Sequence, residues 1–305
     1  MKVFVTGATG YVGGSVVSRL LDAGHEVVGF TRSEEGAGEL EKRGIEPRLG
    51  TLTDYDRLVA AAQDADAVVN AADSDDPWAV AWLLQALEGT GKPFLQTSGA
   101  STVGDRAGGK RSELVFHEDT PLVPSFEKAG RAAIDREVLA AAHRGVRSVV
   151  LCNTLIYGRG LGVHEDSIQV PWMIEQAKRD GAARLVGRGE NVWSTAHIED
   201  VADLYVLAIE RATAGSFFYV ENGEEFSFRS IAEAISRMLG LGSRTEEWPL
   251  DEAIKEWSPE GAIFGFGSNC RVRADKARKM LGWDPKGPSL MAEIESGYYR
   301  QKHGR

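Results

Sequence analysis

Cysteine is scarce in this chain: the 305 residues include only two, Cys152 and Cys270. They lie too far apart in the sequence to form a metal-ligand pair, and they allow at most one disulfide. No group of cysteines and histidines has the spacing of a zinc site. The acidic run at 73–76 is expected to cap a helix rather than to bind a metal. We therefore expect no metal, and free thiols typical of a reducing cytoplasm.

Long apolar runs and basic patches are also missing. No apolar run approaches the roughly 20 residues needed to span a bilayer. Residues 1–5 lead directly into a strand pattern without the apolar core of a signal peptide. The 35 basic and 45 acidic residues give a formal net charge of −10, which disfavours nucleic acid and anionic membranes as partners. We expect a cytoplasmic protein with a small-molecule substrate, and we leave a homodimer open.

Short β-branched runs alternate with helical patterns through the first half of the chain. The expected strands are 3–6, 26–31, 67–71, 93–97 and 148–153. The expected helices are 13–23, 54–63, 78–89 and 129–143. This alternation predicts an α/β fold, a doubly wound parallel sheet of Rossmann type covered by helices on both faces.

The pattern changes after about residue 155. Further on, we expect helices at 170–180 and 227–239 and a strand at 216–221. We assign 1–155 to a dinucleotide-binding Rossmann core, with 190–215 returning to it. We assign 156–189 and 216–305 to a small C-terminal substrate lobe. There Arg271 and Arg273 alternate on an extended segment, either as charged surface or as one face toward an anionic substrate.

Three glycines stand between the first strand and the first helix. Gly7 permits a tight turn, Gly10 lets backbone N–H groups approach a pyrophosphate, and Gly13 allows helix and strand to pack closely. The N-terminus of the helix adds partial positive charge. This arrangement predicts a dinucleotide site.

The end of the second strand indicates which dinucleotide binds. An NAD site usually has a carboxylate at this position for the ribose 2′-hydroxyl, but residues 29–33 contain no acid. Arg32 can instead pair with a 2′-phosphate, with Thr31 or Ser33 adding a hydroxyl. We therefore expect NADP as the cofactor, with NAD as the alternative.

The segment Thr6-Gly7-Ala8-Thr9-Gly10-Tyr11-Val12-Gly13 resembles the fingerprint of extended short-chain dehydrogenases/reductases, the NAD(P)-dependent epimerase/dehydratase group. The segments 50–54, 68–72, 95–99 and 155–158 are similar to further family motifs, in order along the chain; Thr51 replaces the usual aspartate of the adenine loop. The resemblance implies a cofactor site made by Gly7, Thr9, Gly10, Tyr11, Val12, Gly13, Arg32, Thr51, Leu52, Asn70, Ala71, Ala72, Thr97, Leu155 and Ile156.

The chain departs from the family at the proton relay. The family uses a Tyr-x-x-x-Lys pair, with the lysine four residues before a helical glutamate. Counting back from Glu137 places Ala133 and Ala129 at these positions, and residues 124–131 contain no tyrosine. The family's catalytic Ser/Thr falls on Gly99.

Other side chains must then supply the proton. Ser98 and Tyr157 are our predicted catalytic residues. Ser101 is the other nearby hydroxyl, and His164 and Lys128 are the remaining candidates.

We expect an NAD(P)-dependent oxidoreductase of the epimerase/dehydratase type with an atypical active site, acting on a small carbonyl or hydroxyl substrate. Two alternatives remain. A non-catalytic NADP-binding sensor or regulator would have no need of the tyrosine and lysine. A nucleotide-sugar epimerase or dehydratase would need a base to remove a hydroxyl proton.

Overall fold

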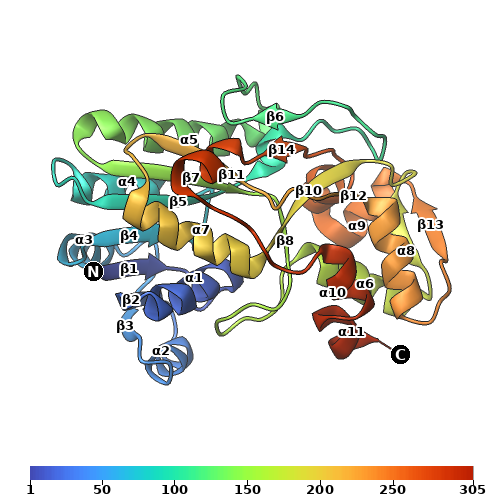
Figure 1. Cartoon of the computed structure of the whole chain (residues 1–305), viewed down its shortest axis with the longest axis horizontal. Coiled ribbons are helices and arrows are strands. Elements are labelled where there is room, and N and C mark those ends of the chain that lie inside the picture. The colour runs from blue at the N-terminus through green and yellow to red at the C-terminus, as the bar shows by residue number, and fades with distance from the viewer. Residues whose placement is uncertain (305) are drawn as a thin grey trace.

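The computed structural model describes residues 1–304, and its centre is a seven-stranded parallel sheet with the order β11-β7-β5-β4-β1-β2-β3 (Figure 1). The strands are β1 (Lys2–Thr6), β2 (Glu26–Thr31), β3 (Glu46–Leu49), β4 (Ala67–Asn70), β5 (Pro93–Gly99), β7 (Arg147–Asn153) and β11 (Ser216–Val220). The chain runs from β1 to one edge through β2 and β3, then returns to β4 and continues to the other edge. This reversal creates a crevice beyond the carboxyl ends of β1 and β4, where ligands bind in such sheets.

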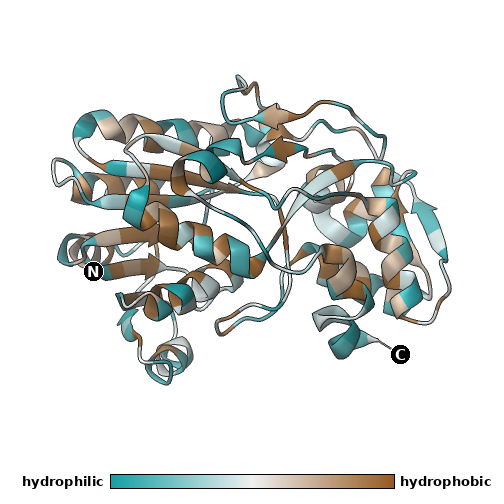
Figure 2. Ribbon diagram, in the orientation of Figure 1, coloured by the Kyte–Doolittle hydropathy of each residue, from teal (hydrophilic) through white to brown (hydrophobic). Residues whose placement is uncertain are grey.

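Both faces of the sheet are buried, and the strands are apolar for that reason. In β1, Val3 and Val5 join the hydrophobic cluster on one face, while Phe4 joins the cluster on the other. All three side chains are fully buried. A strand buried on both sides has no need of alternating polar residues, and Figure 2 shows the central strands in the colour of apolar residues.

Helices cover both faces of the sheet. Val16, Leu40 and Leu204 place α1, α2 and α7 on one face, and Leu58 and Leu83 place α3 and α4 on the other, with α5. The helices of this core are α1 (Tyr11–Asp22), α2 (Glu34–Glu41), α3 (Tyr55–Asp64), α4 (Pro77–Leu87), α5 (Ala129–Ala140) and α7 (Ile198–Arg211). None of the helices within residues 1–304 combines the length and apolar composition needed to cross a membrane.

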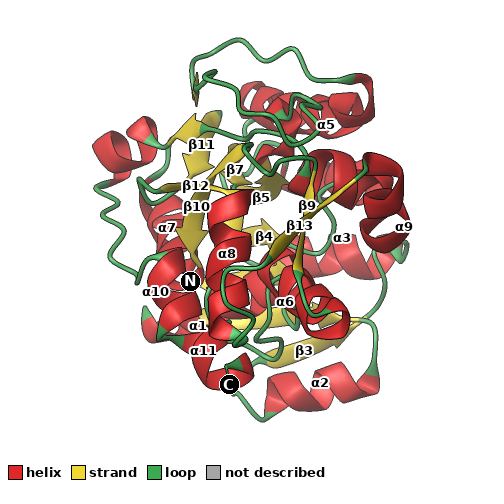
Figure 3. Ribbon diagram, turned by 90° about the vertical axis from the view of Figure 1, so that its right-hand side faces the viewer, coloured by secondary structure: helices red, strands yellow, loops and turns green. Residues whose placement is uncertain are grey.

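A smaller lobe lies beyond the carboxyl ends of the strands and faces the viewer in Figure 3. Its helices are α6 (Gln169–Asp180), α8 (Phe228–Met238), α9 (Leu250–Glu260), α10 (Leu290–Glu295) and α11 (Tyr298–His303). Its strands pair as β8 (Leu155–Tyr157) with β10 (Val192–His197) and β12 (Glu225–Ser227), and as β9 (Ala183–Val186) with β13 (Thr245–Trp248). A further pair, β6 (Phe116–His117) with β14 (Val272–Arg273), lies above the sheet in Figure 1.

Two strands of the central sheet differ from our expectations. We did not predict β3, because the segment 46–49 is short, contains a proline and is only half-buried at the sheet edge. We assigned residues 216–221 to the lobe, but β11 pairs with β7 along its whole length and extends the central sheet. The connection through α7 explains the second error, since that helix carries the chain from β10 in the lobe back onto the core.

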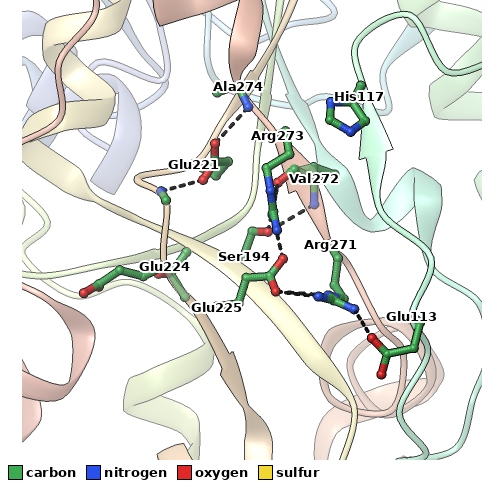
Figure 4. A network of polar contacts seen from close by, with 12 residues as sticks. Glu113, His117, Ser194, Glu221, Glu224, Glu225, Arg271, Val272, Arg273 and Ala274 are labelled. Carbon is green, nitrogen blue, oxygen red and sulfur yellow. Dashed lines mark hydrogen bonds and ion pairs between the residues drawn. The ribbon is translucent and has the colours of Figure 1, made fainter.

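Arg271 and Arg273 are held by carboxylates at the junction of the lobe with β14 (Figure 4). Arg271 bonds to Glu225 at 2.9 Å and also to Glu113 at 2.9 Å, while Arg273 bonds to the other oxygen of Glu225 at 2.6 Å. The side chains of Arg271 and Glu225 are only 10% and 18% exposed. The two arginines therefore join β12 to β14 and have little capacity left for an anionic substrate.

The Glu225→Gln substitution should lower the free energy of unfolding by about 2–3 kcal/mol, because it leaves two half-buried arginines without their shared counter-charge. Urea unfolding followed by circular dichroism measures this loss. The matched control is Glu295→Gln, which removes an exposed pair with Arg237 and should change stability by less than about 1 kcal/mol. Equal losses in the two variants would contradict the structural role of Glu225.

Candidate active site

A cavity of about 380 Å³ opens at the carboxyl ends of β5 and β7, between the core and the lobe. The core contributes Val12 of α1, Ser98 near the end of β5, Ser101 in the turn after β5, and Arg131 of α5. The lobe and the strand leading into it contribute the apolar side chains Ile156, Ile168, Trp172, Trp193 and Phe266. The cavity is thus largely apolar, with hydroxyls and one guanidinium on its core side.

The glycine loop beside this cavity has the shape that a dinucleotide requires. Gly7 has a φ of +69°, and a methyl group at position 13 would lie 2.2 Å from the carbonyl oxygen of Gly7. Gly10 begins α1 without a capping side chain, so the first N–H groups of the helix remain available to a phosphate. These residues fit the pyrophosphate of NAD(P), and Val12, two residues further, reaches the cavity.

Most other predicted cofactor residues lie along the same edge of the sheet. Arg32 follows β2, Thr51 and Leu52 follow β3, and Thr97 lies near the end of β5. Thr9 lies in the loop after β1 and Tyr11 begins α1, while Ala71 and Ala72 lie in the loop after β4. Because carboxyl ends of parallel strands meet at one edge, the fold brings together residues that are far apart in the sequence.

Two of the predicted residues face the interior instead. Asn70 is buried; it accepts a hydrogen bond from the Thr6 hydroxyl at 2.6 Å and donates one to Gln96 at 2.9 Å. Leu155 is fully buried in the core, whereas Ile156 lines the cavity. Asn70 and Leu155 are therefore packed inside the protein and do not line the cavity.

Arg32 stands at the surface beside the start of α2. Ser33 caps this helix by accepting a hydrogen bond from the N–H of Gly36. Within residues 1–304, Arg32 makes no ion pair. Its guanidinium is therefore available to a ligand anion.

Ser98 and Asp135 form a buried pair at the floor of the cavity. The Ser98 hydroxyl donates a hydrogen bond of 2.7 Å to Oδ2 of Asp135 on α5. The two residues are 3% and 6% exposed. Burial raises the pKa of Asp135 to about 6, although the bond from Ser98 acts in the opposite direction. The carboxyl is thus poised to change protonation near neutral pH.

Arg131, one turn earlier on α5, lines the polar side of the cavity. Its Nε donates to Asp75 at 2.8 Å and a second nitrogen bonds the other carboxylate oxygen, while Nη1 donates to the Ser101 hydroxyl at 3.1 Å. This two-point contact fixes the guanidinium plane. Arg131 therefore orients Ser101 toward the space where a substrate would lie.

Lys128 joins α5 to the lobe. The side chain is buried, forms an ion pair with Glu260 and lies 4.6 Å from the ring centre of Phe264. Burial lowers the pKa of Lys128, and the Glu260 carboxylate partly opposes this shift. Lys128 is thus engaged in a structural contact.

The relay positions that we counted back from Glu137 do not face the cavity. Ala133 and Glu137 line a different cavity on the outer side of α5, and Ala129 is exposed. The acid of α5 that bonds to a cavity residue is Asp135. Counting back from it in fours gives Arg131, which lines the cavity, and Glu127, which is exposed.

A helical pattern in the sequence could have revealed this face. Lys128, Arg131 and Asp135 follow each other at intervals of three and four, which places them on one side of a helix.

The structure does not bring Tyr157, which we predicted to be catalytic, to the cavity. It is fully buried; its hydroxyl donates to the carbonyl oxygen of Pro288 at 2.8 Å and accepts from Asn222 at 2.9 Å. Only its neighbour Ile156 lines the cavity, because successive side chains of β8 point in opposite directions. His164 is exposed on the loop that follows β8.

The Asp135→Asn substitution should change stability in a pH-dependent manner. A raised native pKa means that the neutral carboxyl stabilises the fold below about pH 4, and that this contribution is lost as the pH rises through about 6. Asparagine does not ionise. The variant should therefore gain roughly 2–3 kcal/mol of unfolding free energy relative to the wild type between about pH 4 and pH 8.

Urea unfolding at several pH values measures this difference. Glu137→Gln, an exposed acid on the same helix, is the control and should show the same difference from the wild type at each pH. A pH-independent effect of Asp135→Asn would contradict the raised pKa.

Comparisons with known proteins identify the family and the fold of the chain. Residues 3–219 match the model of the NAD dependent epimerase/dehydratase family. Oxidase ucsJ of Acremonium sp is 32% identical over 96% of this chain and 95% of its own length. The 4-hydroxy-2-methyl-3-oxo-4-farnesyl-3,4-dihydroquinoline-1-oxide ketoreductase of Stigmatella aurantiaca is 26% identical over 93% of this chain and 92% of its own.

A solved structure shows the same fold. The dTDP-glucose 4,6-dehydratase of Bacillus anthracis, in complex with NAD, superposes with a TM-score of 0.79 at 18% identity, covering 99% of this chain and 96% of that one. The match in sequence and in fold extends across the Rossmann core, and the chain belongs to the NAD-dependent epimerase/dehydratase family.

Proposed function

We propose that this protein is an NAD(P)-dependent oxidoreductase that interconverts a small, largely apolar carbonyl compound and its alcohol. The observation that carries the proposal is the cavity itself. Its walls include Val12 of the dinucleotide fingerprint, the hydroxyls of Ser98 and Ser101, and the guanidinium of Arg131. A reactive carbonyl held there would lie between hydrogen-bond donors and the edge where the cofactor residues converge.

The residues of the chain have distinct parts in this reaction. A bound nicotinamide supplies or accepts the hydride. Ser98, as first predicted from the sequence, and Ser101 donate hydrogen bonds to the substrate oxygen, and Arg131 fixes Ser101 in place. The apolar walls exclude water and strengthen these contacts. The active site is therefore atypical, because neither Ser98 nor Arg131 reproduces the tyrosine of the family.

The cavity walls favour an apolar substrate over a nucleotide sugar. A diphosphate would need unpaired cations, but Arg188, Arg229 and Arg271 of the lobe bond to Glu190, Glu247 and Glu225. Trp172 and Ile168 instead present exposed apolar surface at the cavity. A ketoreductase among the relatives is named for an aromatic, farnesylated ketone, which accords with this substrate class.

NADP is the cofactor that we propose, with NAD as the alternative. Arg32 is exposed at the end of β2 and has no ion pair within residues 1–304, so a 2′-phosphate can supply its partner.

We propose the cytoplasm as the setting, where the free thiols of Cys152 and Cys270 stay reduced. Light scattering would distinguish a 33.1 kDa monomer from a homodimer.

The function is tested by NADPH and NADH oxidation with a panel of aromatic ketones, aliphatic ketones and quinones. We expect turnover by the wild type on apolar carbonyl compounds. Ser98→Ala should lower kcat about a hundredfold or more, as expected for a lost hydrogen bond to a developing oxyanion. Gly10→Val should abolish cofactor binding, because its side chain occupies the approach of the pyrophosphate. Tight cofactor binding without turnover on any substrate would favour the sensor alternative.

The cofactor preference is tested by fluorescence titration of NADPH and NADH. Arg32→Ala should weaken NADPH binding by about 1.5–3 kcal/mol and leave NADH nearly unchanged, because only NADPH offers the phosphate. Lys42→Ala, a change at another exposed cation that pairs with Glu39, should leave both affinities unchanged. Equal losses for the two cofactors, or a wild-type preference for NADH, would refute this role of Arg32.

A further inference from the structure

We propose that Asp135 and Ser98 form a two-residue proton relay, in which Asp135 stores the proton and Ser98 passes it to the substrate oxygen. The inference rests on the proposed function and supplies the proton that the missing tyrosine would have provided.

A single hydrogen bond connects Asp135 to the cavity. Ser98 lines the cavity and Asp135 does not, but the two are joined by a single hydrogen bond of 2.7 Å between Oγ and Oδ2. The second oxygen of Asp135, Oδ1, is buried and has no hydrogen-bond partner within the described chain. The carboxyl thus has one connection to the cavity, and that connection is Ser98.

The direction of the hydrogen bond between Ser98 and Asp135 depends on the protonation state of the carboxyl. When Asp135 is ionised, the Ser98 hydroxyl must donate to it and cannot donate to a substrate. When Asp135 is protonated, its own O–H can donate to Oγ, and the serine hydrogen is released toward the cavity. The protonation state of the aspartate therefore determines whether Ser98 can act as an acid or as a base.

The charged and titratable groups around Asp135 keep both states accessible. Arg131 on the same helix favours the carboxylate, while Asp75 after β4 and burial favour the neutral form. The charge of Asp135 also acts on the Cys152 thiol of β7 and the Tyr219 hydroxyl of β11. Burial raises the pKa of both groups, so they stay neutral and add no competing charge. The balance holds the pKa of Asp135 near 6, close to a working pH.

Hydride delivery to the carbonyl carbon would leave the electron pair of the C–O π bond on the substrate oxygen. This oxygen takes the hydroxyl proton of Ser98, and Ser98 takes the proton of Asp135 at the same time, so the carboxyl becomes a carboxylate. After the alcohol leaves, one hydronium proton from bulk solvent reaches Asp135 through water in the cavity and Ser98, which restores the neutral carboxyl. Oxidation of an alcohol runs the same transfers in reverse, with the carboxylate as the base.

The other ionisable side chains near the cavity have different partners or do not ionise. Glu260 lines the cavity but is held in its ion pair with Lys128, and an arginine such as Arg131 does not release its proton in proteins. Tyr157 bonds Pro288 and Asn222 away from the cavity.

The kinetic test is the pH dependence of kcat in both directions, with a substrate and alcohol found by the panel described above. For the wild type, carbonyl reduction should fall about tenfold per pH unit above the pKa of Asp135, while alcohol oxidation should rise toward that pKa and level off. Asp135→Asn should lower kcat by about 10²–10⁴-fold and remove this titration. Ser98→Ala should do the same, and Glu137→Gln on the outer side of α5 should retain the wild-type profile.

A second readout needs neither cofactor nor turnover. In the cofactor-free protein, ¹³C-carboxyl NMR should show one aspartate that titrates near pH 6 and that disappears in Asp135→Asn. Ser98→Ala should move this titration to higher pH, because the carboxylate loses its hydroxyl donor. If the Ser98 hydroxyl did not bond to the carboxylate in solution, Ser98→Ala would leave the titration of Asp135 unchanged.

The outcomes separate the relay from the function. Wild-type turnover combined with an unaltered pH profile in Asp135→Asn would overturn the relay and leave the proposed function intact. An Asp135 signal that titrates near 4, or that does not respond to Ser98→Ala, would also overturn it. Absence of wild-type turnover on every carbonyl compound tested would overturn the proposed function, and the relay with it.

Discussion

The close approach of α1 to β1 is the contact on which the rest of the site depends. A single methyl group at position 13 would collide with the carbonyl oxygen of Gly7 at 2.2 Å, so only glycine allows the helix to start where it does. This position aims the N-terminus of α1 at the edge of the sheet and brings Val12 into the cavity wall. The proposed phosphate site and one wall of the cavity thus depend on the same packing contact.

Three residues at the start and on the inner face of α5 connect the elements around the cavity. Lys128, Arg131 and Asp135 each have a different partner: the lobe through Glu260, the loop after β4 through Asp75, and the end of β5 through Ser98. The bond between Ser98 and Asp135 is buried, and a buried hydrogen bond is stronger because little water competes for it. The start of α5 therefore positions polar groups around the cavity, and the N-terminus of α1 lies where we propose that the cofactor binds.

The sequence predicted the central sheet well, but it did not show which face of α5 points toward the cavity. Both outcomes have physical reasons. The strand-helix alternation and the three glycines are local signals, and they placed the sheet and the fingerprint correctly. β3 was missed because an edge strand with a proline lacks the apolar pattern of a buried one. The choice of Glu137 over Asp135 required knowing which side of α5 faces the sheet. Both residues are acids two positions apart, and only the tertiary packing distinguishes them.

The ion pair between Lys128 and Glu260 has a consequence for how the cavity responds to its surroundings. The lysine end is buried, but the Glu260 side chain is 59% exposed, and exposed charges are screened by salt. Glu260 stands at the junction of α9 with the π-helical turn Gly261–Phe266, which supplies part of the apolar wall. The ion pair that joins the lobe to the core at this point therefore weakens as ionic strength rises, and a cavity with a mostly apolar lining becomes dependent on salt through Glu260.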